Sequence, residues 1–150
     1  MTRVQAVVIR GEAVLMVEHR QAGQAYWCLP GGALEPGETP AEGAIRELRE
    51  ECNVTGVVVR QTSYLCYGPE DETYSFLVDI GNQHPALGFD PELPGDQAIL
   101  SDVRWLQLHE IPERDRVFLW AAGLLGTGPF LAEIETWGDD PSYPGAEKHT

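Results

Sequence analysis

The stretch Gly32 to Val54 constrains the fold of this chain most, because it carries a start signal and a stop signal for one helix. Thr39 and Glu42 have the spacing of a capping box, and Pro40 stands at the first helical position, where its missing N–H costs least. Asn53 tolerates the left-handed conformation that ends many helices. The stretch therefore predicts a helix that begins at Pro40 and ends just before Asn53, entered from a glycine-rich loop.

The predicted helix has one apolar face and one acidic face. Its apolar residues recur every three or four positions, as on a helix face that packs against a hydrophobic core. They are Ala44, Ile45, Leu48 and Cys52. Glu47, Glu50 and Glu51 share another face, where like charges destabilise an isolated helix by about 0.2–0.5 kcal/mol per pair. One interpretation is a solvated face, softened by Arg46 and Arg49. The other is a Mg²⁺ site, because Mg²⁺ takes carboxylate oxygens together with waters and substrate phosphates.

The order of these residues resembles the signature of the Nudix hydrolase family, which ends in Arg-Glu-apolar-any-Glu-Glu-any-Gly-apolar. The residues that fall in place are Gly32, Glu38, Arg46, Glu47, Leu48, Glu50, Glu51 and Val54. Asn53 stands where the family usually has Gly, and its tolerance of the same backbone makes the departure conservative. The preceding aromatic-any-Leu-Pro-Gly-Gly run, from Trp27 to Gly32, is also typical of the family, and Trp27 is expected in the core.

The resemblance implies both a fold and a chemistry. The fold would be the α/β Nudix fold, a mixed β-sheet sandwiched between α-helices. The activity would be Mg²⁺- or Mn²⁺-dependent hydrolysis of a diphosphate, with Glu47, Glu50 and Glu51 as metal ligands and the Gly31 carbonyl as a further one. Arg46, Glu47 and Glu50 are the implied catalytic residues, with Arg46 orienting Glu47. The cation would neutralise the diphosphate and activate a water, and the general base is either a signature glutamate or an acid on a later loop.

Residues before the signature are expected to contact the substrate. Gly31 and Gly32 let the backbone approach a ligand closely. Tyr26 is a candidate for stacking on a base, and Arg20 is a candidate for a phosphate contact. His19, by contrast, is expected to be a surface residue.

A late metal ligand or base is expected outside the helix. Glu92 and Asp96 are candidates, because they lie in the long irregular stretch Gly81 to Leu100, and such loops often carry function. The acidic loop Glu70 to Glu72 is another candidate, with a solvated loop as its alternative interpretation. Pro69, fifteen residues beyond the signature, resembles a marker of the ADP-ribose-hydrolysing branch of the family.

Short apolar and β-branched runs predict the strands, the first two of them as a hairpin. These runs are Val4–Ile9, Ala13–Val17, Val54–Val59, Thr62–Tyr67, Thr73–Ile80 and Asp102–Leu108. A second helix is predicted from Glu113 to Leu125, with an apolar face of Val117, Trp120, Ala121 and Leu124.

Chain length limits the number of domains, and net charge limits the kinds of molecule that the protein can bind. A chain of 150 residues predicts one domain over residues 1–137 and a mobile polar tail over 138–150. The net charge of −14 would repel duplex nucleic acid, but bound metal would admit a small phosphorylated substrate.

No apolar run is long enough to span a membrane, and cysteines without a CxxC spacing indicate a reduced, cytoplasmic protein. The family resemblance and the apolar segment Phe130-Leu131, expected as an edge segment or a partner contact, suggest a homodimer.

Two classes of function fit these observations. The leading hypothesis is hydrolysis of a nucleoside diphosphate derivative, such as an NDP-sugar or an ADP-ribose-like compound, to two monophosphates. The alternative substrate is a (deoxy)nucleoside triphosphate, which would give a monophosphate and pyrophosphate. A non-catalytic nucleotide-sensing or binding module belongs to another class; such modules usually have damaged acids, which are intact here.

Overall fold

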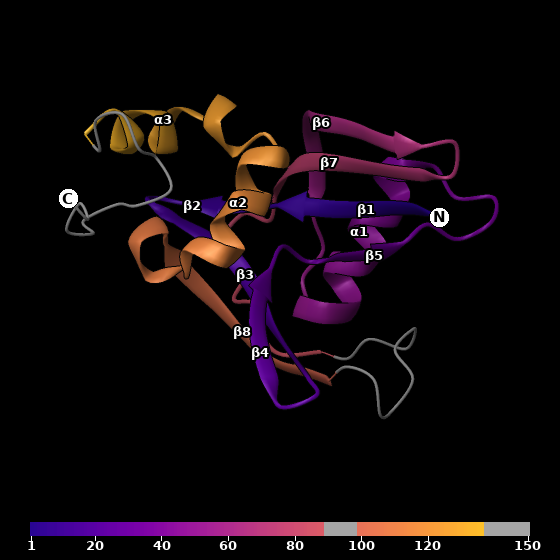
Figure 1. The fold of residues 1–150 in the computed structure, drawn as a ribbon, viewed down its shortest axis with the longest axis horizontal. Helices are drawn as coiled ribbons and strands as arrows, with labels where there is room; N and C mark the ends of the chain where they lie inside the picture. The colour runs from indigo at the N-terminus through magenta and orange to yellow at the C-terminus, as the bar shows by residue number, and fades with distance from the viewer. Residues whose placement is uncertain (89–98, 137–150) are drawn as a thin grey trace.

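The computed structural model describes residues 1–88 and 99–136, which form two β-sheets with helices on either side (Figure 1). The first sheet has the strand order β5-β1-β7-β6, from Gly31–Ala33, Thr2–Val7, Asp71–Asp79 and Val57–Gly68. It is mixed, because β1 runs parallel to β7 and antiparallel to β5. In the second sheet β3 pairs with β2, β4 and β8; these strands are Ala13–Gln21, Ile9–Arg10, Gln24–Cys28 and Ile99–Gln107.

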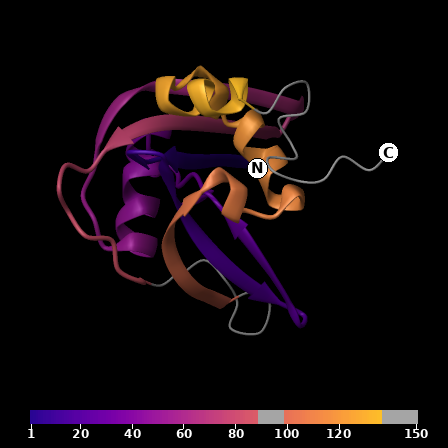
Figure 2. The same ribbon diagram turned by 90° about the vertical axis from the view of Figure 1, so that its left-hand side faces the viewer.

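The helices cover both sides of this arrangement. Figures 1 and 2 show α1 on one side of the first sheet, and α2 and α3 on the other. The helices are α1 (Pro40–Cys52), α2 (Glu113–Ala121) and α3 (Gly128–Glu135), with 3₁₀ turns η1 (Leu108–Glu110) and η2 (Leu124–Gly126). The predicted α/β class, with mixed strands between helices, is confirmed.

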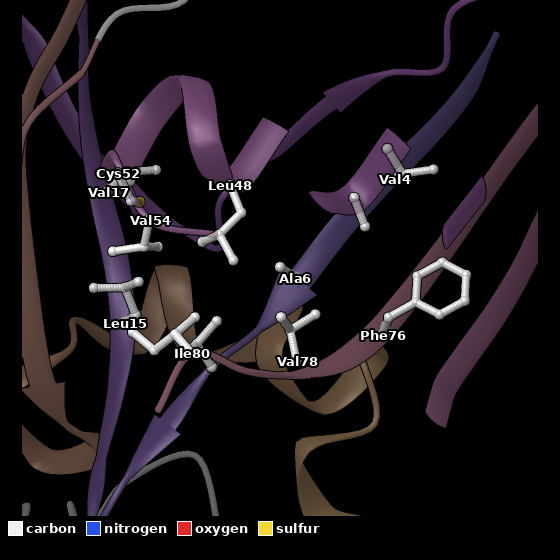
Figure 3. Close-up of a cluster of buried hydrophobic side chains, with 12 residues drawn as sticks. Val4, Ala6, Leu15, Val17, Leu48, Cys52, Val54, Phe76, Val78 and Ile80 are labelled. Carbon is white, nitrogen blue, oxygen red and sulfur yellow. The ribbon is translucent and has the colours of Figure 1, made fainter. Parts of the chain in front are cut away.

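Strand β3 joins the two hydrophobic clusters of the core. Successive side chains of a strand point to opposite faces. Leu15 and Val17 therefore enter the cluster under α1, together with Leu48 (Figure 3), whereas Val14 and Met16 enter the cluster under α2 and α3. Each fully buried aliphatic side chain of this kind contributes about 1.5–3 kcal/mol, so this one strand stabilises both halves of the molecule.

The signature helix has the predicted bounds and caps. Thr39 Oγ1 accepts from the Glu42 N–H at 3.2 Å, and the Glu42 carboxylate accepts from the Thr39 N–H at 2.9 Å, which completes the capping box. Leu48 and Cys52 are fully buried, as the predicted apolar face requires.

Asn53 ends α1 with a left-handed backbone, φ 56°, and also ties down the loop that follows β7. Its side-chain amide donates to the carbonyl oxygens of Ala86 and Leu87 at 3.2 and 3.1 Å. Gly88 in turn donates its N–H to the Glu51 carbonyl at 2.8 Å, which is one of the carbonyls that a helix end leaves without an intrahelical partner. The asparagine therefore adds tertiary contacts that a glycine would lack.

The predicted hairpin at the start of the chain forms only at its tip. The first predicted strand breaks at Val8; β1 leaves for the other sheet, and only the short β2 pairs with β3, at Ile9↔Val14 and Arg10↔Ala13. Alternation identifies a strand but not its partner. The parallel partner of β1 is β7, far along the chain.

Two further strand predictions need correction. The separate strands predicted on either side of Arg60 form one strand, β6, since register shifts at Val58/Arg60 and Gln61/Ser63 absorb the irregular pattern. Strands β4 and β5 were not predicted, because Pro30 between them and the two glycines that begin β5 indicate a loop. The acidic loop is also shorter than expected, since β7 already begins at Asp71.

The second predicted helix is too long, and its predicted apolar face is only partly correct: Leu124 is buried in the second cluster and Trp120 packs against it, whereas Val117 does not. It ends at Ala121, because Gly123 has φ +86° and its backbone approaches the Thr62 carbonyl too closely for a side chain. Leu119 is buried on α2, whereas Val117 is exposed.

The predicted edge segment Phe130-Leu131 belongs instead to helix α3. Phe130 is fully buried in the second cluster of its own chain, whereas Leu131 is partly exposed. A homodimer stays a prediction.

Several predictions fall partly or wholly outside the described ranges. The tail over 138–150 and the candidates Glu92 and Asp96 lie there. Within the described ranges, no helix is both long and apolar enough to cross a membrane. The three cysteines are free thiols. A cytoplasmic location stays a prediction.

The role of Asn53 leads to a stability prediction. Asn53→Ala should lower the free energy of unfolding by about 1–2 kcal/mol, because alanine meets the full cost of the left-handed backbone and loses the side-chain amide. Asn53→Gly loses only the amide contacts and should be destabilised less. Urea unfolding followed by circular dichroism measures both variants, and an Asn53→Ala protein as stable as the wild type would contradict the assignment.

Candidate active site

Two of the three glutamates expected as metal ligands are buried on the face of α1 that meets β5. The side chains of Glu47 and Glu51, one helical turn apart, have 0% exposure, whereas that of Glu50 is 22% exposed. A solvated acidic face is therefore the wrong interpretation for Glu47 and Glu51. Ionised carboxylates are costly to bury unless they are paired or bind a cation, so this face has to be explained by its partners.

Glycines in β5 allow the strand to lie directly on these carboxylates. The Gly31 N–H donates to Glu51 Oε1 at 2.7 Å. A Cβ atom at Gly32 would lie 2.5 Å from Glu47 Oε1 and 2.7 Å from its carboxyl carbon, closer than any side chain tolerates. Gly32 is therefore a steric requirement of the acidic site, whereas Gly31 is required by the neighbouring strand β1, since its Cβ would lie 2.3 Å from the Val4 carbonyl oxygen.

Arg46 joins the signature loop to the helix. Its Nε donates to Glu38 Oε2 at 2.7 Å, its Nη1 to Glu47 Oε1 at 3.0 Å, and its Nη2 to the Ala33 carbonyl at 2.9 Å. Hydrogen bonding to Glu38 raises the pKa of Arg46, and the same contact lowers the pKa of Glu38. Both groups therefore stay charged at neutral pH, and Arg46 contacts Glu47 as the family resemblance implies.

The donor set fits a hard divalent cation. Carboxylate oxygens are the preferred ligands of Mg²⁺ and Mn²⁺, and Glu47 and Glu51 are buried around backbone that only glycine permits. Over residues 1–88 and 99–136, however, no three acidic, histidine or cysteine side chains are already grouped to hold an ion. Arg46 contacts Glu50 as well as Glu47, at 3.3 Å, and the Gly31 amide holds Glu51. Cation binding therefore requires the Glu50 carboxylate to turn from Arg46, whereas the contacts of Glu47 with Arg46 and of Glu51 with Gly31 hold those two carboxylates in position.

His19 is a site residue that the sequence reasoning missed. It was expected at the surface but is only 7% exposed, and its Nε2 lies 3.5 Å from Glu51 Oε2. The signal was present in β3, because His19 continues the alternation of Leu15 and Val17, which both face the α1 cluster. A polar residue in line with two core residues has to find a buried partner.

A cleft of about 980 Å³ opens beside the glycines of β5. Gly31, Gly32, Tyr26 and His19 line it, so three of the predicted substrate contacts come together. Since Gly31 and Gly32 also touch the buried glutamates, β5 separates the cleft from the acidic face by the thickness of one strand. Arg20 is not among the lining residues; it is exposed and its Nε lies 3.4 Å from Glu18 Oε1, so its phosphate contact stays a prediction.

The cleft also contains aromatic and cationic residues that the sequence did not single out. Tyr67 at the end of β6 and Phe118 on α2 line it and are 71% and 64% exposed. Arg3 of β1 and Arg114 of α2 line it as well, and Arg114 is engaged by Asp115 at 2.9 Å. These residues come from distant parts of the chain, and only the fold assembles them.

Tyr26 and Trp27 take different positions at the edge of the cleft. The Tyr26 ring stacks on His19, with ring centroids 5.6 Å apart and an interplanar angle of 16°. Burial raises the pKa of Tyr26, so the phenol is neutral at neutral pH. Trp27 packs against the second cluster, as predicted, and its backbone N–H donates to Asp115 Oδ2 at 2.9 Å.

Of the acidic residues Glu70 to Glu72, only Glu70 lies in the turn between β6 and β7, and the other two begin β7. Glu72 pairs with Thr2 of β1, and the N-terminal amine donates to the Glu70 carbonyl. No group of three or more metal-binding side chains in the described parts of the chain includes them, so their role as late ligands stays a prediction.

Comparisons with known proteins place these features in a family. The family model described as the NUDIX domain matches residues 1–125. The putative mutator protein MutT4 of Mycobacterium tuberculosis is 28% identical over 108 residues, which are 68% of this chain and 41% of that protein. A nucleoside triphosphate pyrophosphatase/Nudix hydrolase fusion protein of Bifidobacterium longum is 27% identical over 67% of this chain and 20% of its own length. The chain thus spans less than half the length of these curated relatives.

Solved structures agree with the fold. An Ap4A hydrolase of C. elegans aligns with a TM-score of 0.62 at 20% identity, over 87% of this chain and 98% of that one. A NUDIX hydrolase of Nitrosomonas europaea aligns with a TM-score of 0.60 at 23% identity, over 76% of this chain and 61% of its own. At these identities the likeness shows the shared fold alone.

The contact between Gly32 and Glu47 leads to a prediction. A ligand that binds only the folded protein stabilises the folded state by about 2.7 kcal/mol at a hundredfold excess over its Kd. Mg²⁺ should therefore raise the Tm of the wild type. Gly32→Ala displaces the Glu47 carboxylate and should remove most of this rise. Gly128→Ala, where an added Cβ meets nothing within 4 Å, is the matched control and should keep it. Equal rises in both variants, measured by scanning calorimetry, would contradict the assignment.

Proposed function

The chain belongs to the NUDIX domain family, and we propose that it hydrolyses the diphosphate linkage of a nucleoside diphosphate derivative with the help of a divalent cation. Derivatives of this class include NDP-sugars and ADP-ribose-like compounds. The observation that carries the proposal is the burial of Glu47 and Glu51 against Gly31 and Gly32, which also line the cleft. A diphosphate bound at β5 would lie beside these carboxylates, and the rest of the substrate would extend along the cleft.

The signature residues have distinct roles in this proposal. Mg²⁺ or Mn²⁺, held by Glu47, Glu50 and Glu51 with the Gly31 carbonyl, would supply positive charge to the diphosphate and acidify a water. Arg46 holds Glu47 in place by the 3.0 Å contact, and Glu38 in turn holds Arg46. Glu50, the least buried of the three glutamates, is the proposed acceptor of the water proton.

The reaction balances as a simple hydrolysis. Water oxygen forms a bond to one phosphorus while the bond from that phosphorus to the bridging oxygen breaks. The bridging oxygen leaves on the other phosphate. The products are a nucleoside monophosphate and the phosphorylated second moiety.

The cleft supports a nucleotide as the substrate. Tyr67 and Phe118 expose large aromatic surfaces inside it, and bases stack on such surfaces with about 1–3 kcal/mol per base. Arg3 offers a cation to phosphate or ribose oxygens in a chain whose net charge is −14. A small nucleotide fits this local chemistry, whereas the overall charge opposes a nucleic-acid duplex.

A (deoxy)nucleoside triphosphate is the second candidate substrate. The name of the B. longum relative includes nucleoside triphosphate pyrophosphatase, although this chain spans only 20% of that protein. The candidates differ in their products, because a nucleoside triphosphate would give a monophosphate and pyrophosphate.

Turnover tests the proposal directly. With Mg²⁺ or Mn²⁺, we expect hydrolysis of NDP-sugars or ADP-ribose to two monophosphates, resolved by chromatography beside a panel of nucleoside triphosphates. Glu51→Gln should lower kcat by at least about 100-fold, since it removes an anionic ligand while keeping the shape of the side chain. Glu135→Gln, an exposed change at the end of α3, is the matched control. Nucleotide binding without turnover of any substrate would instead favour a non-catalytic module.

The aromatic lining leads to a separate prediction about KM. Tyr67→Ala and Phe118→Ala should each raise KM for the nucleotide substrate, on the order of ten-fold, because one stacking surface is lost. The exposed neighbour Val117→Ala, outside the cleft lining, should leave KM unchanged. Steady-state kinetics at saturating Mg²⁺ separate KM from kcat, and unchanged KM in both aromatic variants would remove these residues from the substrate site.

A further inference from the structure

We propose that His19 is a positioning residue for Glu51, a role that rests on the proposed function because Glu51 is there a metal ligand. His19 lies at the wall between the cleft and the acidic face and is 7% exposed. Its Nε2 is 3.5 Å from Glu51 Oε2, and its Nδ1 is 3.2 Å from Cys28 Sγ. Both ring nitrogens therefore face a polar atom.

The ring orientation of His19 is set by the neighbouring strand β4. His19 is directly opposite Tyr26 in the β3–β4 pairing, and the two rings stack. Cys28, two residues along β4 and on the same face, contacts the Nδ1 side. The stacked ring and the thiol thus aim Nε2 at Glu51, and they do so through backbone pairing that does not depend on a flexible loop.

Glu51 is consequently approached at both carboxylate oxygens. The Gly31 N–H donates to Oε1 at 2.7 Å, and His19 Nε2 faces Oε2. A carboxylate approached in this way loses rotational freedom before a cation arrives. Since residues that orient a metal ligand typically change metal affinity by about 10–100-fold when they are removed, the loss of His19 should be visible in cation binding itself.

The alternative role for a buried histidine is packing of its ring. Three substitutions at His19 distinguish this packing role from the positioning of Glu51. His19→Phe keeps an aromatic ring that can stack on Tyr26 but has no nitrogen to face Glu51. His19→Gln loses the ring but places an amide N–H near the position of Nε2. His19→Asn keeps a polar group on the Cys28 side but is too short to reach Glu51.

The test is Mn²⁺ binding to the full chain, measured from the electron paramagnetic resonance signal of free Mn²⁺ without any substrate. We expect His19→Phe and His19→Asn to weaken Mn²⁺ binding by about ten-fold or more, and His19→Gln to stay within about three-fold of the wild type. His109→Gln, an exposed histidine in η1, is the matched control and should bind as the wild type does. Near-ultraviolet circular dichroism identifies variants that have not folded, and if His19→Phe is one of them, His19→Asn carries the comparison.

Glu51→Gln, measured in parallel, separates the two proposals. If Glu51→Gln binds Mn²⁺ as tightly as the wild type, the metal site of the proposed function is wrong. If Glu51→Gln weakens binding while folded His19→Phe or His19→Asn does not, His19 has no positioning role. Weakening by His19→Gln that equals or exceeds the weakening by His19→Phe would also overturn the role, because the amide in place of Nε2 would then rescue nothing.

Discussion

The close packing of β5 on α1 is the constraint on which the rest of the structure depends. Gly31 and Gly32 bring backbone within contact of two buried carboxylates, and any side chain at Gly32 would collide with Glu47. β5 pairs with β1, which pairs with β7 in turn, so the position of the acidic helix is transmitted to the whole first sheet. The cleft lies along the same strand, which is why the acidic site and the cleft are adjacent.

The electrostatics of the site oppose its stability and favour cation binding. Glu47 and Glu51 are fully buried, and Arg46 divides its hydrogen bonds among Glu38, Glu47 and Glu50. Burying carboxylates costs several kcal/mol per ion before compensation. A site that concentrates negative charge beside rigid backbone is poorly suited to holding a fold together and well suited to binding a divalent cation. The two apolar clusters that β3 connects supply the stability that this arrangement requires.

The predictable part of the site was the part carried by local sequence. The bounds of α1, its capping box and its left-handed Asn53 follow from interactions within a few residues, so the pattern was sufficient. His19 was misplaced, because its burial depends on β4 and Glu51, although the alternation of β3 indicated its direction. The extent of α2 was misjudged for a similar reason: the approach of Gly123 to Thr62, a contact between distant elements, ends the helix early.

The sequence by itself determined the family, the signature helix and the acidic chemistry, because spacing along one helix decides which carboxylates share a face. Only the tertiary structure decided which of those carboxylates are buried, which histidine meets them and which aromatic residues line the cleft. Arg3, Tyr67 and Phe118 come from three elements far apart in the chain and have no shared local pattern. Their proximity depends on strand pairing and on the docking of α2, which arise from packing between distant segments and which short-range periodicity cannot encode.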